Sequence, residues 1–235
     1  MNKNSFKLVS RRIGYSNSVL IVNGSKSILV DTGVRGHAKD FRFLFKQHGL
    51  TPNDIKLIIL THAHYDHTGN LHKLKKLTGA KVLVHKNEFE NLKNGFIPIP
   101  NGQGRYSGLI SKLGKLITPK FASPRPFVAD LINEEIFDLK DFGLDGKVIS
   151  TPGHTTGSQS VLLGKNLIAG DTVVNFKNGK IFPPFCNEPV VLLQTWKKLL
   201  ELEIEKIYPG HGKSLSREDI IPEFEKWSKR FAIKD

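Results

Sequence analysis

Residues 59–70 read ILTHAHYDHTGN, which sets three histidines and an aspartate within six positions. The cluster directly follows the apolar run IKLIIL at residues 55–60, which predicts a strand buried on both faces. Residues that directly follow a rigid strand lie at the edge of the sheet, where several loops meet. Such residues suit a binding or catalytic site. The four polar residues of the cluster are His62, His64, Asp66 and His67.

Three later strands end in the same way. The runs KVISTPGH, NLIAGD and KIYPGH each place a histidine or an aspartate one to four residues behind an apolar strand. Imidazole nitrogen and carboxylate oxygen fit zinc better than calcium or magnesium, which favour oxygen, while iron and manganese stay open. The candidate metal ligands are His62, His64, Asp66, His67, His154, Asp171 and His211.

Seven ligands are too many for one tetrahedral ion. The sequence therefore predicts two ions that share a bridging carboxylate, roughly 3.5–4 Å apart. His62 and His64 lie two positions apart and can point the same way from an extended turn. Asp66 and His67 then turn toward the neighbouring ion, and we expect Tyr65 to face elsewhere.

The composition is that of an ordinary globular protein. Of 235 residues, 39% are hydrophobic and 24% are charged, and no apolar run approaches the roughly 18–20 residues of a membrane span. We expect a cytoplasmic protein without membrane association. The one cysteine, Cys186, excludes an internal disulfide and a cysteine-rich zinc finger. The net charge of +13 favours acidic partners without naming one.

The remaining chain alternates short strands with helices. An Asn-Gly turn between two aliphatic runs predicts a hairpin, and apolar spacing of three and four residues predicts helices. Two halves of strands with outer helices indicate a layered α/β sandwich. Expected strands are 18–22, 27–33, 55–60, 81–84, 147–150, 160–163, 166–170 and 206–208, and expected helices are 36–48, 71–79, 192–200 and 216–230.

We expect a single domain over residues 1–235, with residues 94–130 as an elaborated loop or lid. This segment has mixed turn signals and weak periodicity, and it contains no acidic residue before Asp130. If it covers a pocket, its basic side chains favour an anionic substrate; a solvated basic surface stays an open alternative. The candidate lid residues are Arg105, Tyr106, Lys112 and Lys115.

The motifs THAHYDH, TPGHTTGS, AGDT and YPGHG, with DTG at residues 31–33, resemble the five ordered motifs of the metallo-β-lactamase superfamily. The resemblance covers residues 16–213 and implies a four-layered αββα sandwich. By matching position, Asp31 binds no metal and steadies the ligand loop. The implied ligand sets are His62, His64 and His154 for one metal and Asp66, His67 and His211 for the other, with Asp171 bridging them.

The resemblance and the paired ions imply a metal-dependent hydrolase. Two zinc ions lower the pKa of a shared water, so that a bridging hydroxide can attack an ester, thioester or lactone carbonyl at neutral pH. We expect Asp66 to orient the hydroxide and to carry its proton to the leaving group. The substrate is expected to be a small molecule, anionic if the basic lid covers it.

The motifs are most similar to the glyoxalase II and thioesterase branch of the superfamily. Only 24 residues follow His211, so we do not expect that branch's C-terminal helical domain or its glutathione-thioester specificity. The lactonases of the family often carry a tyrosine shortly after the bridging aspartate, whereas this chain reads DTVVNF from Asp171. A lactone substrate is therefore less favoured.

Three alternatives stay open. A zinc-dependent nuclease or phosphodiesterase would use the charge of +13 to attract nucleic acid, although no nucleic-acid module is recognisable. A mononuclear iron persulfide dioxygenase shares several of the ligands. A non-catalytic zinc-binding domain would keep the fold without turnover, but structural zinc sites are normally closed by four protein ligands. The sequence leaves the oligomeric state undetermined.

Overall fold

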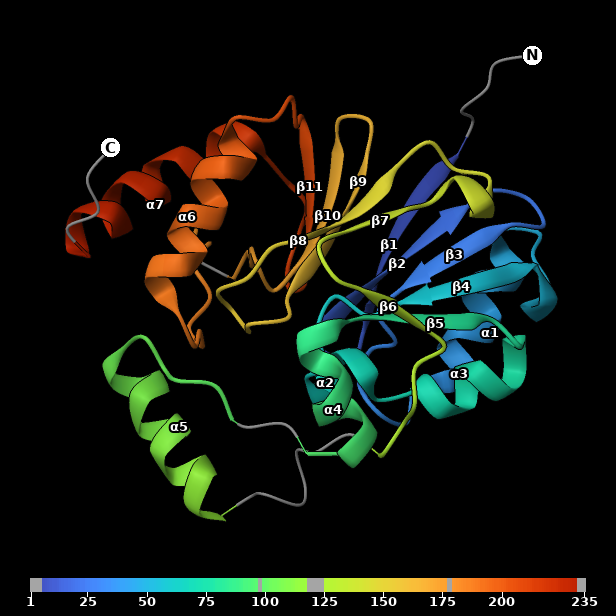
Figure 1. Cartoon of the computed structure of the whole chain (residues 1–235), viewed down its shortest axis with the longest axis horizontal. Coiled ribbons are helices and arrows are strands. Elements are labelled where there is room, and N and C mark those ends of the chain that lie inside the picture. The colour runs from blue at the N-terminus through green and yellow to red at the C-terminus, as the bar shows by residue number, and fades with distance from the viewer. Residues whose placement is uncertain (1–5, 97–98, 118–124, 177–178, 232–235) are drawn as a thin grey trace.

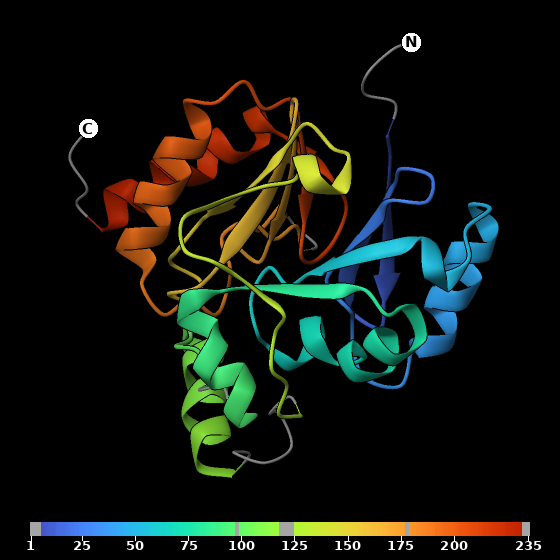
Figure 2. The same cartoon turned by 45° about the vertical axis from the view of Figure 1, so that its right-hand side comes forward.

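A computed structural model of the chain describes residues 6–96, 99–117, 125–176 and 179–231. Two six-stranded sheets lie face to face, and helices cover the outer side of each sheet (Figure 1). The architecture is the αββα sandwich that the sequence predicted. Turning the molecule by 45° shows α1 and α3 beside the first sheet and α6 and α7 beside the second (Figure 2).

The first sheet has the strand order β1-β2-β3-β4-β5-β6, and the second has the order β12-β11-β10-β9-β8-β7. The first sheet contains β1 (Lys7–Ile13), β2 (Ser16–Val22), β3 (Ser27–Val30), β4 (Ile55–Ile59), β5 (Lys81–His85) and β6 (Leu131–Asn133). The second contains β7 (Ile136–Asp138), β8 (Lys147–Ser150), β9 (Gln159–Leu163), β10 (Asn166–Gly170), β11 (Lys206–Pro209) and β12 (Leu215–Ser216).

The helices follow β3, β4 and β5 in the first half and β10 and β12 in the second. They are α1 (Ala38–Gln47), α2 (Tyr65–Thr68), α3 (Leu71–Thr78), α4 (Lys86–Asn94), α5 (Arg105–Ile117), α6 (Pro189–Leu200) and α7 (Arg217–Arg230), with short 3-10 helices at Pro52–Asp54 and Lys140–Phe142. In the described part of the chain, we find no helix with the length and apolar character needed to cross a lipid bilayer.

Three apolar cores hold the four layers together. The middle core joins Ile28 of the first sheet to Ile168 of the second, so the inner faces pack directly on each other. A second core places Phe41 of α1 and Leu74 of α3 against the first sheet, and a third places Trp196 of α6 against the second. Burying each such side chain contributes about 1.5–3 kcal/mol. These cores fix the two sheets relative to each other.

Strand direction brings the sequence motifs to one edge of the sandwich. In the first sheet, β3 and β4 are parallel neighbours, so their carboxyl ends lie together. In the second sheet, β9 is antiparallel to both β8 and β10, and β11 is parallel to β10. The strands β8, β10 and β11 therefore run the same way. The residues that follow all of these strands can meet between the two sheets.

Local sequence accounts for the predicted helices. Helix α1 buries Phe41, Leu44 and Phe45 along one face, as expected for the helix at residues 36–48. Helix α3 ends at Gly79, whose positive φ of 68° is the left-handed conformation that glycine adopts without a steric penalty. Helix α7 begins at Ser216, which forms a capping box with Asp219.

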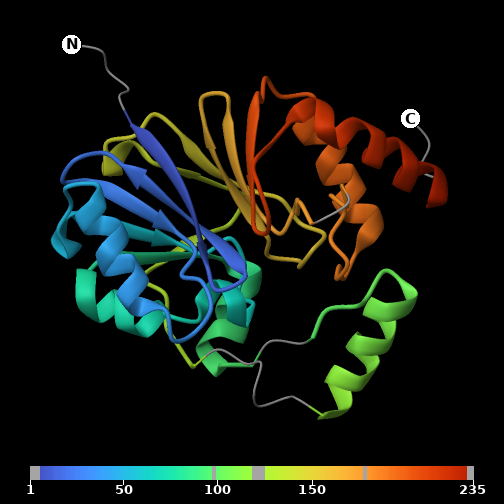
Figure 3. The ribbon, with the colours of Figure 1, turned by 180° about the vertical axis from the view of Figure 1, so that it is seen from behind.

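The expectation of a loop at residues 94–130 is wrong in part, because residues 105–117 form helix α5. Tyr106, Leu109, Ile110 and Leu113 do recur at helical spacing, but two glycines lower the helical propensity, which is why a helix was not predicted here. Leu109 and Ile110 are more than half exposed. Seen from the front and from behind, α5 lies apart from the two sheets (Figure 3). Residues 118–124 of the expected lid lie outside the described residues.

Candidate metal centre

The seven candidate ligands lie together at the edge where the strands end. Four come from the loop and short helix α2 behind β4, and the other three follow β8, β10 and β11. Every one of them is at most 8% exposed, which is unusual for ionisable side chains unless they are paired or bind metal. They are His62, His64, Asp66, His67, His154, Asp171 and His211.

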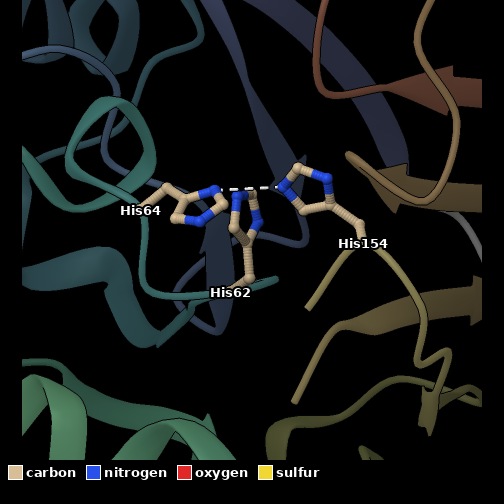
Figure 4. Close-up of side chains that lie close together, drawn as sticks. All are labelled: His62, His64 and His154. Atoms are coloured by element: carbon tan, nitrogen blue, oxygen red, sulfur yellow. Dashed lines mark hydrogen bonds between the residues drawn. The ribbon is translucent and has the colours of Figure 1, made fainter. Parts of the chain in front are cut away.

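One group consists of His62, His64 and His154, whose rings lie close together from two different loops (Figure 4). Nδ1 of His64 lies 3.0 Å from Nε2 of His154, and one ligand atom from each residue falls within 4.8 Å of the others. Nε2 of His62 is buried without a hydrogen-bond partner. Three imidazoles that converge in this way provide three of the four ligands of a tetrahedral zinc site.

A second group consists of Asp66, His67 and His211. Nε2 of His211 lies 3.4 Å from Oδ2 of Asp66, and Nε2 of His67 lies 3.8 Å from the same oxygen. Nε2 of His67 is fully buried and has no hydrogen-bond partner. This group therefore offers two nitrogens and one oxygen around a common point.

Asp171 faces both groups. Its Oδ2 lies 3.6 Å from Nε2 of His154 and 3.3 Å from Nε2 of His211, while its Oδ1 lies 3.3 Å from Nε2 of His67. Oδ1 is buried without a hydrogen-bond partner. A single carboxylate between two sets of ligand atoms has the position that a bridging ligand requires.

These residues fit the metal ions that the motifs imply. Buried nitrogen and oxygen atoms without hydrogen bonds are costly in a folded protein, and a divalent cation would bind the orphaned atoms of His62, His67 and Asp171. The donor set of imidazole nitrogens and carboxylate oxygens is the one that zinc prefers.

Hydrogen bonds on the far side of the rings orient the ligands. Nδ1 of His154 donates to the carbonyl of Phe185, and Nδ1 of His211 donates to the carbonyl of Tyr15, each at 2.8 Å. A carbonyl can only accept, so each ring carries its proton on Nδ1 and presents the lone pair of Nε2 to the centre.

Asp31 performs the same task for His67. Its Oδ2 accepts from Nδ1 of His67 at 2.8 Å, and its two oxygens also accept from the backbone N–H and the hydroxyl of Thr61. Asp31 is the non-glycine residue with a positive φ, 61°, in the described part of the chain. This conformation turns its carboxylate back toward the ligand loop.

Charge is distributed unevenly over the metal-free centre. Burial lowers the pKa of His64 to about 3 and holds that of His62 well below its ordinary value. Burial also disfavours protonation of His211, but the carboxylates of Asp171 and Asp66 together outweigh it and raise the pKa of His211 to about 10. The pKa of His67 is raised in the same way. Because metal ligands must be deprotonated, metal uptake displaces these protons.

A cavity of about 1090 Å³ opens onto the centre. Its walls include His64, Asp66, His154, Asp171 and His211, so the ligands face a space large enough for a substrate. A structural zinc site would be closed by its protein ligands instead.

Two tyrosines that the sequence did not single out for the site line this cavity. Tyr65 was expected to face elsewhere, but it borders the cavity, and Tyr15 donates a hydrogen bond to its Oη at 2.6 Å. The ring of Tyr15 also stacks on His211. Tyr208, which lies close to His211 in the sequence, is buried in the core between the sheets. The position of Tyr65 inside THAHYDH was the available signal; Tyr15 had none.

Glu88 is a third residue near the centre that the sequence did not reveal. It lies on α4, only 2% exposed, and its carboxylate hydrogen-bonds to the backbone of Ala63 and Gly157 and to the side chain of Thr155. Ala63 lies between two ligands of the first half, and Thr155 follows His154. Glu88 therefore ties the ligand loops of the two halves together.

The predicted lid residues do not lie where the sequence analysis expected them. Tyr106 is 86% exposed, and neither it nor Lys112 lines the cavity. The side chains of Arg105 and Lys115 lie outside the described residues. The same segment does reach the cavity through Ile99, Pro100 and Ile110, all apolar.

Comparison with known proteins agrees with this fold. The family model of the metallo-beta-lactamase superfamily matches residues 11–211. A probable metallo-hydrolase of Methanocaldococcus jannaschii is 33% identical over 85% of this chain and 89% of its own length. The chain belongs to the metallo-β-lactamase superfamily. Within it, the protein is a metallo-hydrolase.

Two further similarities are more limited. A hydroxyacylglutathione hydrolase of Shewanella pealeana is 30% identical over 53% of this chain and 35% of its own length. The solved structure of a class B3 di-zinc metallo-β-lactamase from an Alaskan soil metagenome has a TM-score of 0.65 at 20% identity and covers 97% of this chain and 89% of its own. The latter shows a shared fold.

Proposed function

We propose that the protein hydrolyses a carboxylic ester, thioester or lactone with two zinc ions. One observation carries the proposal: Oδ2 of Asp171 lies within 3.6 Å of nitrogens from both histidine groups, on the wall of an open cavity. His62, His64 and His154 would hold one ion, Asp66, His67 and His211 would hold the other, and Asp171 faces both groups.

When bound, the two ions supply a nucleophile from water near neutral pH and polarise a carbonyl oxygen. The chain's own groups position the reactants and move the proton. Asp66 borders the cavity, so one oxygen of its carboxylate can bind metal beside His211 while the other accepts a proton from the attacking water. The same carboxylate then returns this proton to the leaving group.

Tyr65 supplies a neutral hydrogen-bond donor on the same wall. Because Tyr15 donates to its oxygen, the hydrogen of Tyr65 remains available for a substrate atom. We assign Tyr65 the task of holding the substrate's carbonyl or leaving group beside Asp66. Tyr15 positions Tyr65 and does not itself need to contact the substrate.

The cysteine does not compete as a nucleophile. Cys186 is fully buried and donates from Sγ to the carbonyl of Gly153. Burial raises the pKa of its thiol to about 12, so the reactive thiolate is scarce at neutral pH. An activated water is the nucleophile that the described site favours.

The first test combines metal analysis with a rate screen. Protein purified without added metal is assayed for zinc, iron and manganese, and hydrolysis is measured on esters, thioesters, lactones, phosphodiesters and single-stranded RNA. About two zinc ions per chain with turnover of one carbonyl class is the expected result. One iron ion without any hydrolysis would favour a dioxygenase, and turnover of RNA or phosphodiesters alone would favour a nuclease.

A variant separates proton transfer from metal binding. Asp66→Asn keeps an oxygen at the same position but removes the basic carboxylate. We expect a loss of turnover that exceeds the loss of bound metal, measured on the same protein batch. Full turnover in this variant would remove Asp66 from the mechanism.

A further inference from the structure

The cavity beside the metal centre has one basic wall. Arg12 and Ser10 alternate on β1 and so share a face, and both line the cavity. Lys213 borders the same space. Asn17, which pairs with Arg12 across β1 and β2, donates from Nδ2 to the carbonyl of Gly212 and holds this segment in place.

The positive charge of this wall is not neutralised. Within the described residues, neither Arg12 nor Lys213 forms an ion pair, and Arg12 donates its Nε only to the carbonyl of Gly14. The acidic side chains that line the cavity are Asp66 and Asp171, which already face the histidines. A substrate group that reaches Arg12 and Lys213 therefore meets two cations.

A second wall of the cavity is apolar. Ile99, Pro100 and Ile110 come from the segment that carries α5, and Pro184 and Phe185 come from the loop ahead of α6. Backbone hydrogen bonds join the two segments: Gln103 donates to the carbonyl of Pro184, and Cys186 to that of Asn101, each at 2.8 Å. No charged side chain that the structure describes lines this wall.

Each wall adjoins a different ligand group. The apolar wall is continuous with the group of His62, His64 and His154, because Nδ1 of His154 bonds the carbonyl of Phe185. The basic wall adjoins the group that contains Asp66 and His211, since Lys213 lies two residues beyond His211. Each of the two walls therefore has a different ligand group beside it.

We propose that the substrate is an ester or thioester that joins an apolar acyl group to an anionic alcohol or thiol, with the anion bound at Arg12 and Lys213. This inference rests on the proposed hydrolase activity. Asp66 settles the direction: it protonates the leaving group and lies in the ligand group beside the basic wall. The anion, a carboxylate or a phosphate, therefore belongs to the leaving group, and the acyl group contacts Ile110 and Phe185.

The reaction is a simple hydrolysis. The bond from the acyl carbon to the leaving sulfur or oxygen breaks, and the oxygen of water forms a new bond to that carbon. The proton that water loses passes through Asp66 to the leaving group. No oxidant, reductant or further reactant is needed.

Four thioesters test both walls at once. They combine an octanoyl or an acetyl group with either 3-mercaptopropionate, which is anionic, or N-acetylcysteamine, which is neutral. We expect the metal-loaded protein to turn over the anionic octanoyl compound with roughly tenfold higher kcat/KM than its neutral partner, mainly through KM. The acetyl compounds are expected to react more slowly. Equal kcat/KM for the anionic and neutral octanoyl compounds would overturn the inference.

Matched variants locate the effect. Arg12→Gln combined with Lys213→Gln should remove the preference for the anion, whereas Arg11→Gln should keep it, because Arg11 lies on the other face of the same strand. Ile110→Asn should weaken the preference for octanoyl over acetyl, and Leu109→Asn should not. Ile110 and Leu109 are similarly exposed, but Ile110 alone of the two lines the cavity. A preference that survives in the double variant would contradict the assigned anion site.

A binding measurement separates this inference from the proposed activity. The probes are 2-oxononyl thioethers of the same two thiols, in which a CH2 group stands between the octanoyl carbonyl and the sulfur, so that they resist hydrolysis. Calorimetry on metal-loaded protein should show roughly tenfold tighter binding of the anionic probe, lost in the double variant. If this pattern appears and no ester or thioester is hydrolysed, the proposed activity fails and the anion site stands. If thioesters are hydrolysed without the pattern, the anion site fails.

Discussion

The two halves of the molecule build the candidate metal centre in different ways. The first sheet supplies four candidate ligands from one loop, residues 62–67, behind the single strand β4. The second sheet supplies His154, Asp171 and His211 from three separate strand ends. The first set depends on local chain geometry, whereas the second depends on the register of a whole sheet. Substitutions in the first half and substitutions in the second half should therefore have different effects on metal binding.

The largest expected effect is at the point where the two halves meet. Asp171→Ala removes the carboxylate that faces both ligand groups, so we expect the loss of both ions and a fall in turnover of about 1,000-fold, equivalent to about 4 kcal/mol. Asp66→Ala removes a ligand from one group only and should retain about one ion per chain. Mass spectrometry of bound metal and a rate assay on each variant distinguish the two. Two ions in Asp171→Ala would refute the bridging position.

A smaller effect on metal affinity is expected at Asp31, which supports the ligand loop at residues 62–67. Asp31→Ala removes the acceptor for Nδ1 of His67 and for Thr61, and such contacts are typically worth 10–100-fold in metal affinity or activity. Competition with a chelator of known affinity measures the change. Asp138→Ala, on an exposed carboxylate of β7, is the control and should leave the affinity unchanged. If the unmodified protein, Asp31→Ala and Asp138→Ala bind metal with equal affinity, Asp31 does not support the ligand loop.

Glu88 provides a test of the connection between the halves. Glu88→Ala removes hydrogen bonds to the ligand loops of both halves, so the free energy of unfolding of the metal-free chain should fall by about 1–3 kcal/mol. Urea unfolding measures it. If Glu88 does not connect the two halves, the free energy of unfolding of Glu88→Ala will equal that of the unmodified chain within experimental error.

The same residue predicts a pH dependence. Burial raises the pKa of Glu88 above its ordinary value of 4.5, despite hydrogen bonds that favour the charged form. The folded chain therefore binds more protons than the unfolded chain above pH 4.5, and this contribution to stability is lost as the pH rises through the folded-state pKa. Glu88→Gln should gain stability relative to the unmodified chain over that interval. A constant difference from pH 4 to 8 would contradict the raised pKa.

A moderate effect is expected at the tyrosine pair, which belongs to the first half. Tyr65→Phe removes the hydroxyl but keeps the ring, so we expect about tenfold lower kcat with unchanged bound metal, the equivalent of one neutral hydrogen bond. Tyr106→Phe changes an exposed tyrosine away from the cavity and serves as the control. Unaltered kcat in Tyr65→Phe would leave this hydroxyl without a catalytic task.

The smallest effect is expected at Cys186 in the second half. Cys186→Ala should keep bound metal and turnover, and unfolding should become easier by about 1 kcal/mol through the lost contact to Gly153. Metal analysis, the rate assay and urea unfolding check this on one sample. A large loss of turnover with normal metal content would make the thiol part of the chemistry.

The sequence predicted that the seven candidate ligands lie together, but it did not predict the residues around them. Each ligand follows an apolar strand, so its place at a sheet edge follows from the pattern alone. Strand β1 was missed, because KLVSRRI is an exposed edge strand whose polar residues show no regular alternation. Because this strand was not predicted, Arg12 and the strand pairing that positions Tyr15 were not predicted either. Glu88 was missed because a charged residue in a polar helix is normally solvated, and its burial depends on tertiary packing.

Asp31 also has a consequence for engineering. A residue other than glycine with φ near 60° costs roughly 1–2 kcal/mol, and aspartate tolerates it better than most. Glycine at this position would relieve that cost but would leave His67 without its acceptor. The carboxylate also accepts from the N–H and the hydroxyl of Thr61, and each buried donor left without an acceptor costs about 1–3 kcal/mol, so Asp31→Gly would lower stability and weaken the ligand loop together. A design protocol that replaces left-handed residues with glycine to gain heat resistance should therefore leave this position unchanged.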